Sequence, residues 1–302
     1  MSSDTQQSRD AQQGRDAQRS RDARQGRDAQ HSRDPRQGPD AQQGRFAGKV
    51  AMVTGAGSGM GAAVARQLVA EGARAVVLAD VNSENAGTVA KGLSVGRAVA
   101  LDVADAPAVD AAVADIVREH GRLDVVVHAA GVDDPEAKEL IADALVHGRP
   151  AEVTDRLTDT AWGRVMRINL DGTFHVLRAA VRVMRPRKAG AIVVIGSSSA
   201  FDTPVGYPHY AASKAGVHAL TQAVAKEVVA SGIRVNVVAP GPTETGMAAR
   251  TPAALRSGFA DPRVRPYATP EEIADIALFL AGDAAANLVG AVLLANGGRF
   301  TV

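Results

Sequence analysis

A serine, a tyrosine and a lysine are the residues of this chain whose spacing most directly suggests chemistry. Tyr210 and Lys214 stand four residues apart in HYAASKAG, and Ser197 lies thirteen residues before Tyr210 in IVVIGSSSA. On a helix, an i, i+4 spacing places the tyrosine and the lysine on one face, one turn apart. A free phenol titrates near ~10, and a neighbouring ammonium lowers that pKa. We therefore predict that Tyr210 transfers a proton with the help of Lys214, while the serine hydroxyl holds a substrate oxygen.

Such a Tyr–Lys pair also occurs on ordinary amphipathic helices, so its meaning depends on the elements that would position it. Short apolar runs alternate with helix-length amphipathic stretches, which predicts βαβ units around a parallel sheet covered on both faces. The predicted strands are 49–55, 75–80, 98–103, 123–131, 191–198, 234–241 and 291–298, and the predicted helices are 59–72, 84–93, 106–120, 160–185, 208–231, 244–257 and 270–282. The pattern indicates a single doubly wound Rossmann-type α/β domain, residues 46–302, with a seven-stranded parallel sheet.

Composition excludes several classes of function. The 302 residues carry a net charge of +1, which indicates neither a nucleic-acid-binding nor a membrane-binding surface. The chain has no cysteine, which excludes disulfides, thiolate metal sites and cysteine nucleophiles. No run approaches the roughly 18 apolar residues that a membrane span needs, and no signal peptide opens the chain. We therefore expect a soluble cytoplasmic protein.

Residues 8–43 repeat every six residues, in units such as SRDAQQ and GRDAQR. A period of six matches neither a helix nor a strand, and the repeat has no apolar face. Arginine and aspartate nearly balance, and Gly, Gln, Ser and Pro fill the remainder, which is typical of disorder. We predict that residues 1–45 are a disordered leader, either a solvated tail or the product of a misassigned start. A tether or a weak RNA-contacting arm is the alternative.

The first predicted strand leads directly into a glycine-rich turn, TGAGSGMG, residues 54–61. Gly55 permits the tight turn, Gly59 lets the backbone approach a pyrophosphate, and Gly61 lets helix and strand pack closely. The backbone N–H groups at the start of the next helix would face that anion. Ordinary turn chemistry is the alternative, but the strand before and the helix after the turn favour a dinucleotide site.

Asp80 ends the second predicted strand, nineteen residues after Gly61. A carboxylate at this position can accept hydrogen bonds from both adenosine ribose hydroxyls and would repel a 2′-phosphate. Val81 and Asn82 follow it, and no Arg or Lys lies in the glycine turn to neutralise such a phosphate. The sequence therefore predicts NAD(H) rather than NADP(H).

With these motifs together, the chain resembles the short-chain dehydrogenase/reductase family over residues 46–298. TGAGSGMG matches the family's T-G-x-x-x-G-x-G, HAAG (128–131) matches N-A-G after the fourth strand, and PGPTET (240–245) matches P-G-x-x-x-T. No single motif is specific, but the jointly spaced set is. The resemblance implies an NAD(H)-dependent oxidoreductase that interconverts a secondary alcohol and a ketone, and it implies a homotetramer.

The resemblance also implies roles for individual residues. In the catalytic tetrad, Tyr210 exchanges the proton, Lys214 lowers its pKa and binds the nicotinamide ribose, Ser197 orients the substrate oxygen, and Asn169 connects Lys214 to solvent. Ser199 is the alternative to Ser197. The implied cofactor contacts are Gly55, Gly57, Ser58, Gly59, Met60, Gly61, Asp80, Asp102, Val103, Ala129, Ala130, Gly131, Tyr210, Lys214, Pro240, Gly241, Thr243 and Thr245. No metal site is expected.

The sequence departs from the family pattern after the fourth predicted strand. Residues 132–161 are longer than usual by roughly a dozen residues and contain a helix-like stretch, AKELIADALVHG. This insertion shapes either the substrate pocket or a subunit contact. We interpret its Asp133, Asp134 and Glu136 as a solvated loop, and His128, which replaces the usual asparagine, as a packed and satisfied histidine.

Side chains from two segments are expected to line the substrate pocket. One segment is residues 242–268, in the place of the family's mobile substrate loop, and the other lies around Tyr210. The candidates are Phe201, Tyr207, His209, Thr245, Met247, Arg250 and Phe259. Trp162 is expected to be a packing residue at the start of its helix.

Two alternative functions stand beside the leading one. The first is an NADPH-type reductase of 3-oxoacyl carriers, against which Asp80 argues. The second is a dinucleotide-binding protein without turnover, a sensor or scaffold, against which the complete tetrad argues.

Overall fold

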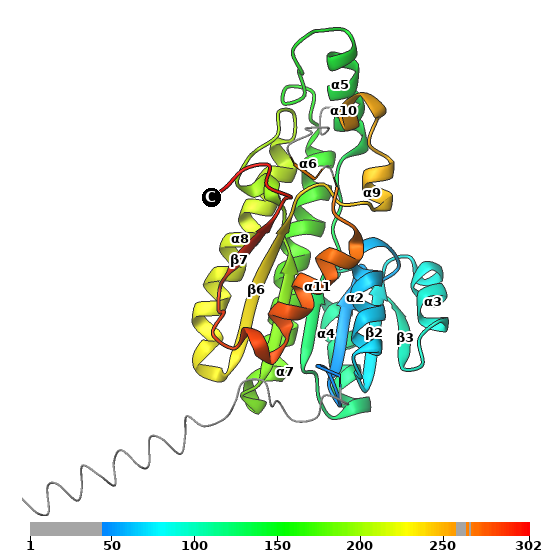
Figure 1. Ribbon diagram of the computed structural model, residues 1–302, viewed down its shortest axis with the longest axis vertical. Coiled ribbons are helices and arrows are strands. Elements are labelled where there is room, and N and C mark those ends of the chain that lie inside the picture. The colour runs from blue at the N-terminus through cyan, green and yellow to red at the C-terminus, as the bar shows by residue number, and fades with distance from the viewer. Residues whose placement is uncertain (1–43, 258–263, 266) are drawn as a thin grey trace, which may run out of the picture. The chain divides into compact units, whose positions relative to one another are not determined.

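A parallel sheet of seven strands forms the centre of the domain (Figure 1), in a computed structural model that describes residues 44–257, 264–265 and 267–302. The strand order is β3-β2-β1-β4-β5-β6-β7. The strands are β1 (Val50–Thr54), β2 (Ala75–Asp80), β3 (Gly96–Ala100), β4 (Val125–His128), β5 (Gly190–Ile195), β6 (Ile233–Pro240) and β7 (Val292–Ala295). The chain winds outward from β1 to β3 and then crosses back to place β4 beside β1. The predicted doubly wound α/β sheet is confirmed.

Helices cover both faces of this sheet. They are α2 (Gly59–Ala70), α3 (Ser83–Lys91), α4 (Ala106–His120), α5 (Pro135–Val146), α6 (Asp159–Met166), α7 (Gly172–Met184), α8 (Pro208–Val228), α9 (Gly246–Ala249), α10 (Ala253–Ser257) and α11 (Pro270–Ala281). Figure 1 shows α2 and α11 side by side against the strands. Side chains of α2, α3 and α11 form one buried core, and those of α4, α7 and α8 form the other.

The two cores follow from the alternation of side chains along each strand. Ala51 and Val53 of β1 belong to the core beneath α2 and α11, whereas Val50 and Met52 belong to the core beneath α4, α7 and α8. Successive strand residues point to opposite faces, so a strand covered on both sides needs an unbroken apolar run. This is why the strands could be read from continuous runs of valine and alanine.

Helix starts are encoded locally where a capping residue and a proline coincide. Thr269 caps α11 by accepting from Glu272 N at 3.2 Å, and the Glu272 carboxylate accepts from Thr269 N at 2.9 Å. Pro270 occupies the first turn, where the backbone N–H that proline lacks would have no partner within the helix. This capping box fixes α11 where the sequence predicted a helix.

Several predicted elements differ from those in the structure. The fourth and seventh strands, like the third, end three residues earlier than predicted. The third strand ends at Ala100, because Asp102 Oδ1 accepts from Ala104 N at 2.9 Å and closes a turn. The predicted helix 160–185 is interrupted by a π-helical turn, Arg167–Asp171. The predicted helix 244–257 is two short helices, α9 and α10, and Pro252 immediately precedes the second, where a proline cannot continue a helix.

The predicted leader, residues 1–45, lies outside the described residues except for Gly44 and Arg45, whose guanidinium pairs with Glu71. Among the helices of the described ranges, none is long and apolar enough to cross a bilayer.

Candidate active site

The predicted proton-transfer residues meet just beyond the carboxyl end of β5. Ser197 lies two residues past that strand, and Tyr210 and Lys214 lie on α8, four residues apart. The Ser197 hydroxyl is near enough to the Tyr210 phenol to lower its pKa, and Lys214 Nζ lies 5.9 Å from the centre of the Tyr210 ring. Ser197 and Lys214 are buried, whereas Tyr210 is half-buried. Ser199 contributes its backbone instead, since its N–H donates to Ser197 Oγ at 3.1 Å.

Burial dominates the protonation of this cluster. Burial raises the pKa of Tyr210, the hydrogen bond with Ser197 lowers it, and the charge of Asp133 raises it further. Burial also lowers the pKa of Lys214 to about 8. The Lys214 ammonium donates to the carbonyl of Ile195 at 3.0 Å. The net shift is upward, so the phenol is protonated at neutral pH, and a lowering of the Tyr210 pKa by Lys214 stays a prediction.

Asn169 is held beside Lys214 by the segment that leaves β4. It lies in the π-helical turn, where its Oδ1 accepts from Val132 N at 2.8 Å and its Nδ2 donates to Val132 O at 3.0 Å. Its Nδ2 also donates to Ser213 Oγ at 3.1 Å. A Cβ added to Gly131 would lie 3.2 Å from Asn169 Oδ1 and 3.5 Å from Lys214 Nζ. One packed cluster is therefore formed by residues 131–132, 169 and 213–214. The two hydrogen bonds between Asn169 and Val132 were not predicted from the sequence.

The glycine turn packs tightly against two other predicted cofactor segments. Gly55 has φ +65°, and a Cβ there would lie 2.7 Å from Ala130 N. A Cβ on Gly61 would lie 2.2 Å from Gly55 O, and one on Gly59 would lie 3.1 Å from Thr245 Cγ2. No side chain fits the first two positions without moving backbone. The turn after β1, the turn after β4 and the loop after β6 thus meet at one edge of the sheet.

Asp80 is anchored where a ribose would lie. Its Oδ2 accepts from Gly57 N at 2.9 Å, and its Oδ1 accepts from Asn82 N at 2.8 Å. Each carboxylate oxygen keeps a further lone pair for a hydroxyl donor. The N-cap residue of α2, Ser58, makes no side-chain capping hydrogen bond, so the first N–H groups of that helix are open to an anion. These residues fit a dinucleotide.

The other predicted cofactor residues lie along the same edge, with different exposures. Asp102 is exposed in the turn after β3, while Val103 is buried against α7. Thr243 is buried, and its hydroxyl donates to Gly241 O at 3.1 Å, just past Pro240 at the end of β6. Ala129 and Met60 are partly buried against the core of α2 and α11.

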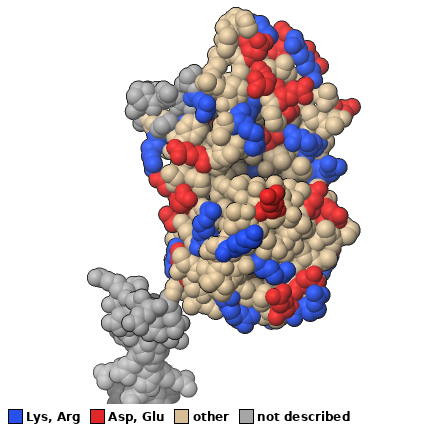
Figure 2. Space-filling view, turned by 90° about the vertical axis from the view of Figure 1, so that its right-hand side faces the viewer, with Lys and Arg blue, Asp and Glu red and all other residues tan. Residues whose placement is uncertain are grey.

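A hollow lies between the glycine turn and the substrate loop, on the face drawn in Figure 2. Its volume is about 520 Å³. Its lining comes from α2, from the 244–249 segment and from the start of α11: Gly59, Arg66, Glu244, Thr245, Gly246, Ala248, Ala249, Arg256, Tyr267, Pro270 and Glu271. Among the residues that the structure describes, no group of three His, Cys, Asp or Glu side chains could hold a metal ion.

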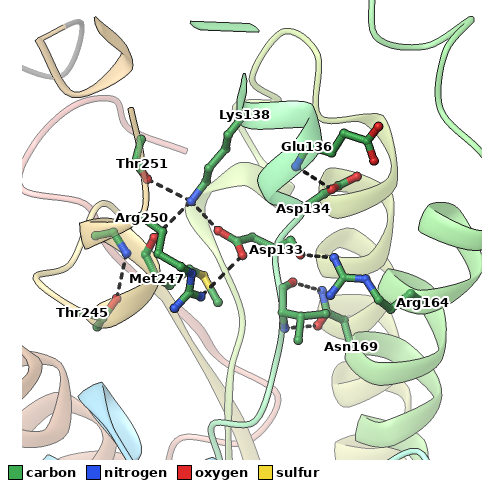
Figure 3. Close-up of polar contacts among 12 residues, drawn as sticks. Asp133, Asp134, Glu136, Lys138, Arg164, Asn169, Thr245, Met247, Arg250 and Thr251 are labelled. Atoms are coloured by element: carbon green, nitrogen blue, oxygen red, sulfur yellow. Dashed lines mark hydrogen bonds and ion pairs between the residues drawn. The ribbon is translucent and has the colours of Figure 1, made fainter. Parts of the chain in front are cut away.

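The insertion is bound to the substrate loop through Lys138, which also forms a buried ion pair within the insertion (Figure 3). The Lys138 ammonium pairs with the Asp133 carboxylate, and it donates to Thr251 Oγ1 at 2.9 Å and to Met247 O at 3.2 Å. The interpretation of Asp133 as part of a solvated loop is wrong, because Asp133 is only 5% exposed. α5 also packs on α10. Within one chain, the insertion therefore contacts the substrate loop.

Asp134 connects the insertion to the start of α8. It is 5% exposed, so the solvated-loop interpretation is wrong for it too, whereas Glu136 is exposed. Asp134 Oδ2 lies 3.0 Å from His209 Nε2, and Asp134 O accepts from the Tyr207 hydroxyl at 3.3 Å. His209 is fully buried, so it cannot line a pocket as predicted. The Tyr207 ring meets the Tyr210 ring edge-on, with centroids 5.9 Å apart.

The remaining candidates have mixed outcomes. His128 is buried, and its Nδ1 lies 2.7 Å from Thr54 Oγ1, but its Nε2 has no hydrogen-bond partner in the described part of the chain. Burial and the charge of Lys214 lower the pKa of His128 to about 3, so it is neutral. The prediction that Trp162 is a packing residue is wrong within this chain, because Trp162 is 42% exposed. The Phe201 ring lies tilted beside the His218 ring, with centroids 5.2 Å apart, and Phe259 lies outside the described residues.

Comparison with known proteins agrees with this geometry. A family model described as short chain dehydrogenase matches residues 49–256. The chain is 41% identical over 262 residues to cis-4-hydroxycyclohexanecarboxylate dehydrogenase of Sinomonas cyclohexanicum, covering 85% of this chain and 98% of that one. It is 34% identical over 263 residues to 3-oxoacyl-[acyl-carrier-protein] reductase FabG of Salmonella typhimurium, covering 85% and 99%.

The fold has a close match among solved structures. The crystal structure of gox2181 covers 84% of this chain and 96% of its own, with a TM-score of 0.72 and 31% identity. The family model, the two relatives and the shared fold all span the catalytic domain and not one motif alone. The chain therefore belongs to the short chain dehydrogenase family and is an NAD(P)-dependent oxidoreductase.

Proposed function

We propose that this enzyme interconverts a secondary alcohol and a ketone with NAD(H), and that Tyr210 exchanges the proton on the substrate oxygen. The observation that supports this most strongly is the cluster of Ser197, Tyr210 and Lys214 at the carboxyl end of β5, with the Lys214 ammonium 5.9 Å from the centre of the Tyr210 ring. A hydroxyl and a phenol that share one oxygen atom of the substrate can orient it and move its proton.

The chain's own residues account for the proton. When a ketone is reduced, the Tyr210 hydroxyl donates its proton to the carbonyl oxygen, and when an alcohol is oxidised, the phenolate accepts the hydroxyl proton. Ser197 holds the same oxygen, and Lys214 stabilises the phenolate that reduction leaves behind. Bound NAD(H) supplies or accepts the hydride that balances this proton. Asn169 positions Lys214 by fixing Val132 and Ser213 around it.

Asp80 supports NAD(H) as the cofactor. Its carboxylate is anchored by Gly57 N and Asn82 N, so it cannot turn away from a 2′-phosphate without losing both hydrogen bonds. The expected result is tighter binding of NADH than of NADPH, measured by titration. Asp80→Ser, which removes the charge, should narrow that difference. Equal affinities in the unaltered enzyme would contradict the assignment.

The names of the two relatives suggest two substrate classes. One acts, by its name, on a hydroxycyclohexanecarboxylate, which is a secondary alcohol, and the other is a 3-oxoacyl carrier reductase. We favour the alcohol dehydrogenase because Asp80 supports NAD(H). A protein that binds the dinucleotide without turnover is disfavoured by the assembled Ser197–Tyr210–Lys214 cluster.

We further propose a cytoplasmic homotetramer. Trp162 on α6 is 42% exposed and Phe174 on α7 is 44% exposed, and these adjoining helices present apolar surface that a second copy would cover. Light scattering tests the assembly.

The test of the function is a substrate screen followed at the nicotinamide absorbance. The full-length enzyme is given NAD⁺ or NADP⁺ with a panel of secondary alcohols that includes 4-hydroxycyclohexanecarboxylate and its methyl ester, and 3-oxoacyl thioesters are tested with NADH and NADPH. We expect turnover with NAD⁺ and a cyclic or branched secondary alcohol. Turnover confined to 3-oxoacyl thioesters with NADPH would replace the proposal with the reductase, and cofactor binding without any turnover would replace it with the sensor.

A further inference from the structure

Three cationic side chains gather around Asp133, at the edge of the candidate active site (Figure 3). The Lys138 ammonium pairs with the Asp133 carboxylate. Arg164 Nη2 donates to the backbone carbonyl of Asp133 at 2.7 Å, and Arg250 Nη2 lies 3.9 Å from Asp133 Oδ1. The neighbouring carboxylate, Asp134, is directed to His209 instead. Two cations, Lys138 and Arg250, therefore face one carboxylate, and Arg164 binds the backbone of the same residue.

Arg250 is the least engaged of these cations. The Lys138 side chain is 11% exposed and reaches three oxygen atoms, and Arg164 donates to a backbone carbonyl. The Arg250 side chain is 60% exposed, and its 3.9 Å separation from Asp133 is at the outer limit of an ion pair. Such a pair contributes little to stability. A guanidinium held this loosely can exchange its present contact for a better one.

The carboxylate that the Arg250 guanidinium approaches, Asp133, adjoins the segment that packs on the proton-transfer cluster. Asp133 directly follows Val132, which Asn169 holds with two hydrogen bonds, and Gly131 lies against Lys214. The carboxylate of Asp133 is also near enough to Tyr210 to raise its pKa.

The Arg250 side chain is folded over the start of α9. Its Nη1 lies 3.8 Å from where a Cβ on Gly246 would be, while Nη2 points at Asp133. Gly246 follows Thr245, which touches the glycine turn. The guanidinium thus reaches from the substrate loop toward Asp133 of the insertion.

We propose that Arg250 binds the carboxylate of the substrate, so that the enzyme acts on hydroxy acids and oxo acids whose secondary alcohol or ketone lies apart from the carboxylate. This rests on the proposed function. A planar guanidinium binds a carboxylate through two parallel hydrogen bonds, which fixes both distance and orientation. Lys138 pairs with Asp133 and offsets its repulsion of such a ligand.

The test compares acids with neutral analogues in the full-length enzyme. Turnover of 4-hydroxycyclohexanecarboxylate is compared with that of its methyl ester, and binding of cyclohexanecarboxylate to the NADH complex is compared with that of cyclohexanecarboxamide by calorimetry. Both comparisons are made in the unaltered enzyme, in Arg250→Gln and in Arg149→Gln. Arg149 is a matched control, because it lies on the insertion and pairs with Asp143 at the surface.

We expect Arg250→Gln to lower kcat/KM for the acid by roughly 10- to 100-fold, mainly through KM, the loss of one charge-assisted hydrogen-bonded contact. The ester should change by less than about twofold, and Arg149→Gln should change neither. An equal loss for acid and ester would mean a structural role and would overturn the proposal. The proposal would also be overturned if Arg250→Gln left turnover of the acid unchanged. It would be overturned as well if cyclohexanecarboxylate bound the NADH complex no better than the carboxamide.

These outcomes are distinguishable from failure of the proposed function. If the enzyme turns over neutral alcohols with NAD⁺ but shows no Arg250-dependent preference for acids, only the carboxylate site is refuted. If an acyl-carrier thioester alone is turned over and depends on Arg250, both are refuted, and the arginine contacts the carrier instead.

Discussion

Replacing Lys214 with methionine should make the protein more stable and inactive. Lys214 is 6% exposed, and burial lowers its pKa from the ordinary 10.5 to about 8. At ~1.36 kcal/mol per pKa unit, holding this ammonium in the folded state costs about 3 kcal/mol at neutral pH. Methionine is similar in length, apolar and flexible enough to fill the site. Its main polar loss is the hydrogen bond to Ile195 O, worth about 1 kcal/mol, beside a distant contact of the ammonium with the Tyr210 ring.

The net expectation for Lys214→Met at pH 7 is a gain of about 2 kcal/mol in the free energy of unfolding. For a domain of this size, that corresponds to a rise in Tm of roughly 4–8 °C. The assay is reversible urea unfolding at matched protein concentration, with thermal melting beside it. Lys226→Met is the control, since Lys226 is an exposed residue of the same helix and should shift stability by less than about 0.5 kcal/mol.

The pH dependence separates the burial cost of a charge from a general packing effect. Because the pKa of Lys214 is lower in the folded state, the unfolded chain binds more protons between about pH 8 and 10.5. The free energy of unfolding of the unaltered protein therefore rises with pH across that window, whereas that of the variant does not. The stability advantage of Lys214→Met should shrink across the window and disappear by about pH 10.5. A variant that is less stable at pH 7, or whose advantage does not change with pH, would refute the reasoning.

Two other perturbations have defined outcomes. Ser197→Ala should lower kcat by about 100-fold or more. Ser199→Ala should change kcat by less than about fivefold, because Ser199 contributes only its backbone N–H to Ser197. Steady-state kinetics of both variants test this, and equal losses of kcat would contradict the assignment. Lys138→Met should destabilise the fold by about 3 kcal/mol, because it leaves the Asp133 carboxylate buried without its cation. Adding Asp133→Asn should recover most of this loss, as measured by urea unfolding. A double variant that is no more stable than the single one would contradict the account of a buried ion pair.

The parts of the fold that sequence could predict are those with local causes. β1 and β2 follow from unbroken apolar runs, and α11 follows from Thr269, Pro270 and Glu272 acting within one turn. The glycine turn was predictable for the same reason, since its spacing is set by local backbone conformation. The Tyr210–Lys214 pair was predictable because a helix fixes the relation of residues four apart.

The features that were missed depend on residues far apart in sequence. Lys138, the partner of Asp133, is covered by Thr251 from 113 positions away, and His209 reaches Asp134 across 75, so the burial of these aspartates is not visible in the neighbouring sequence. The π-helical turn accommodates contacts of Asn169 with Val132, which no local pattern encodes. The direction of the Tyr210 pKa was missed because burial, invisible in a motif, outweighs the spacing of charges.

Removal of the Tyr210 hydroxyl tests the central claim most directly. Tyr210→Phe keeps the ring and its edge-on contact with Tyr207 but removes the atom that would exchange the proton. The measurement is single-turnover formation of NADH from NAD⁺ and the best alcohol of the screen, with NADH affinity measured on the same sample. We predict a rate lower by at least about 1,000-fold with NADH affinity changed by less than about threefold. A rate within tenfold of the unaltered enzyme, with the cofactor bound, would show that the proton passes through another group.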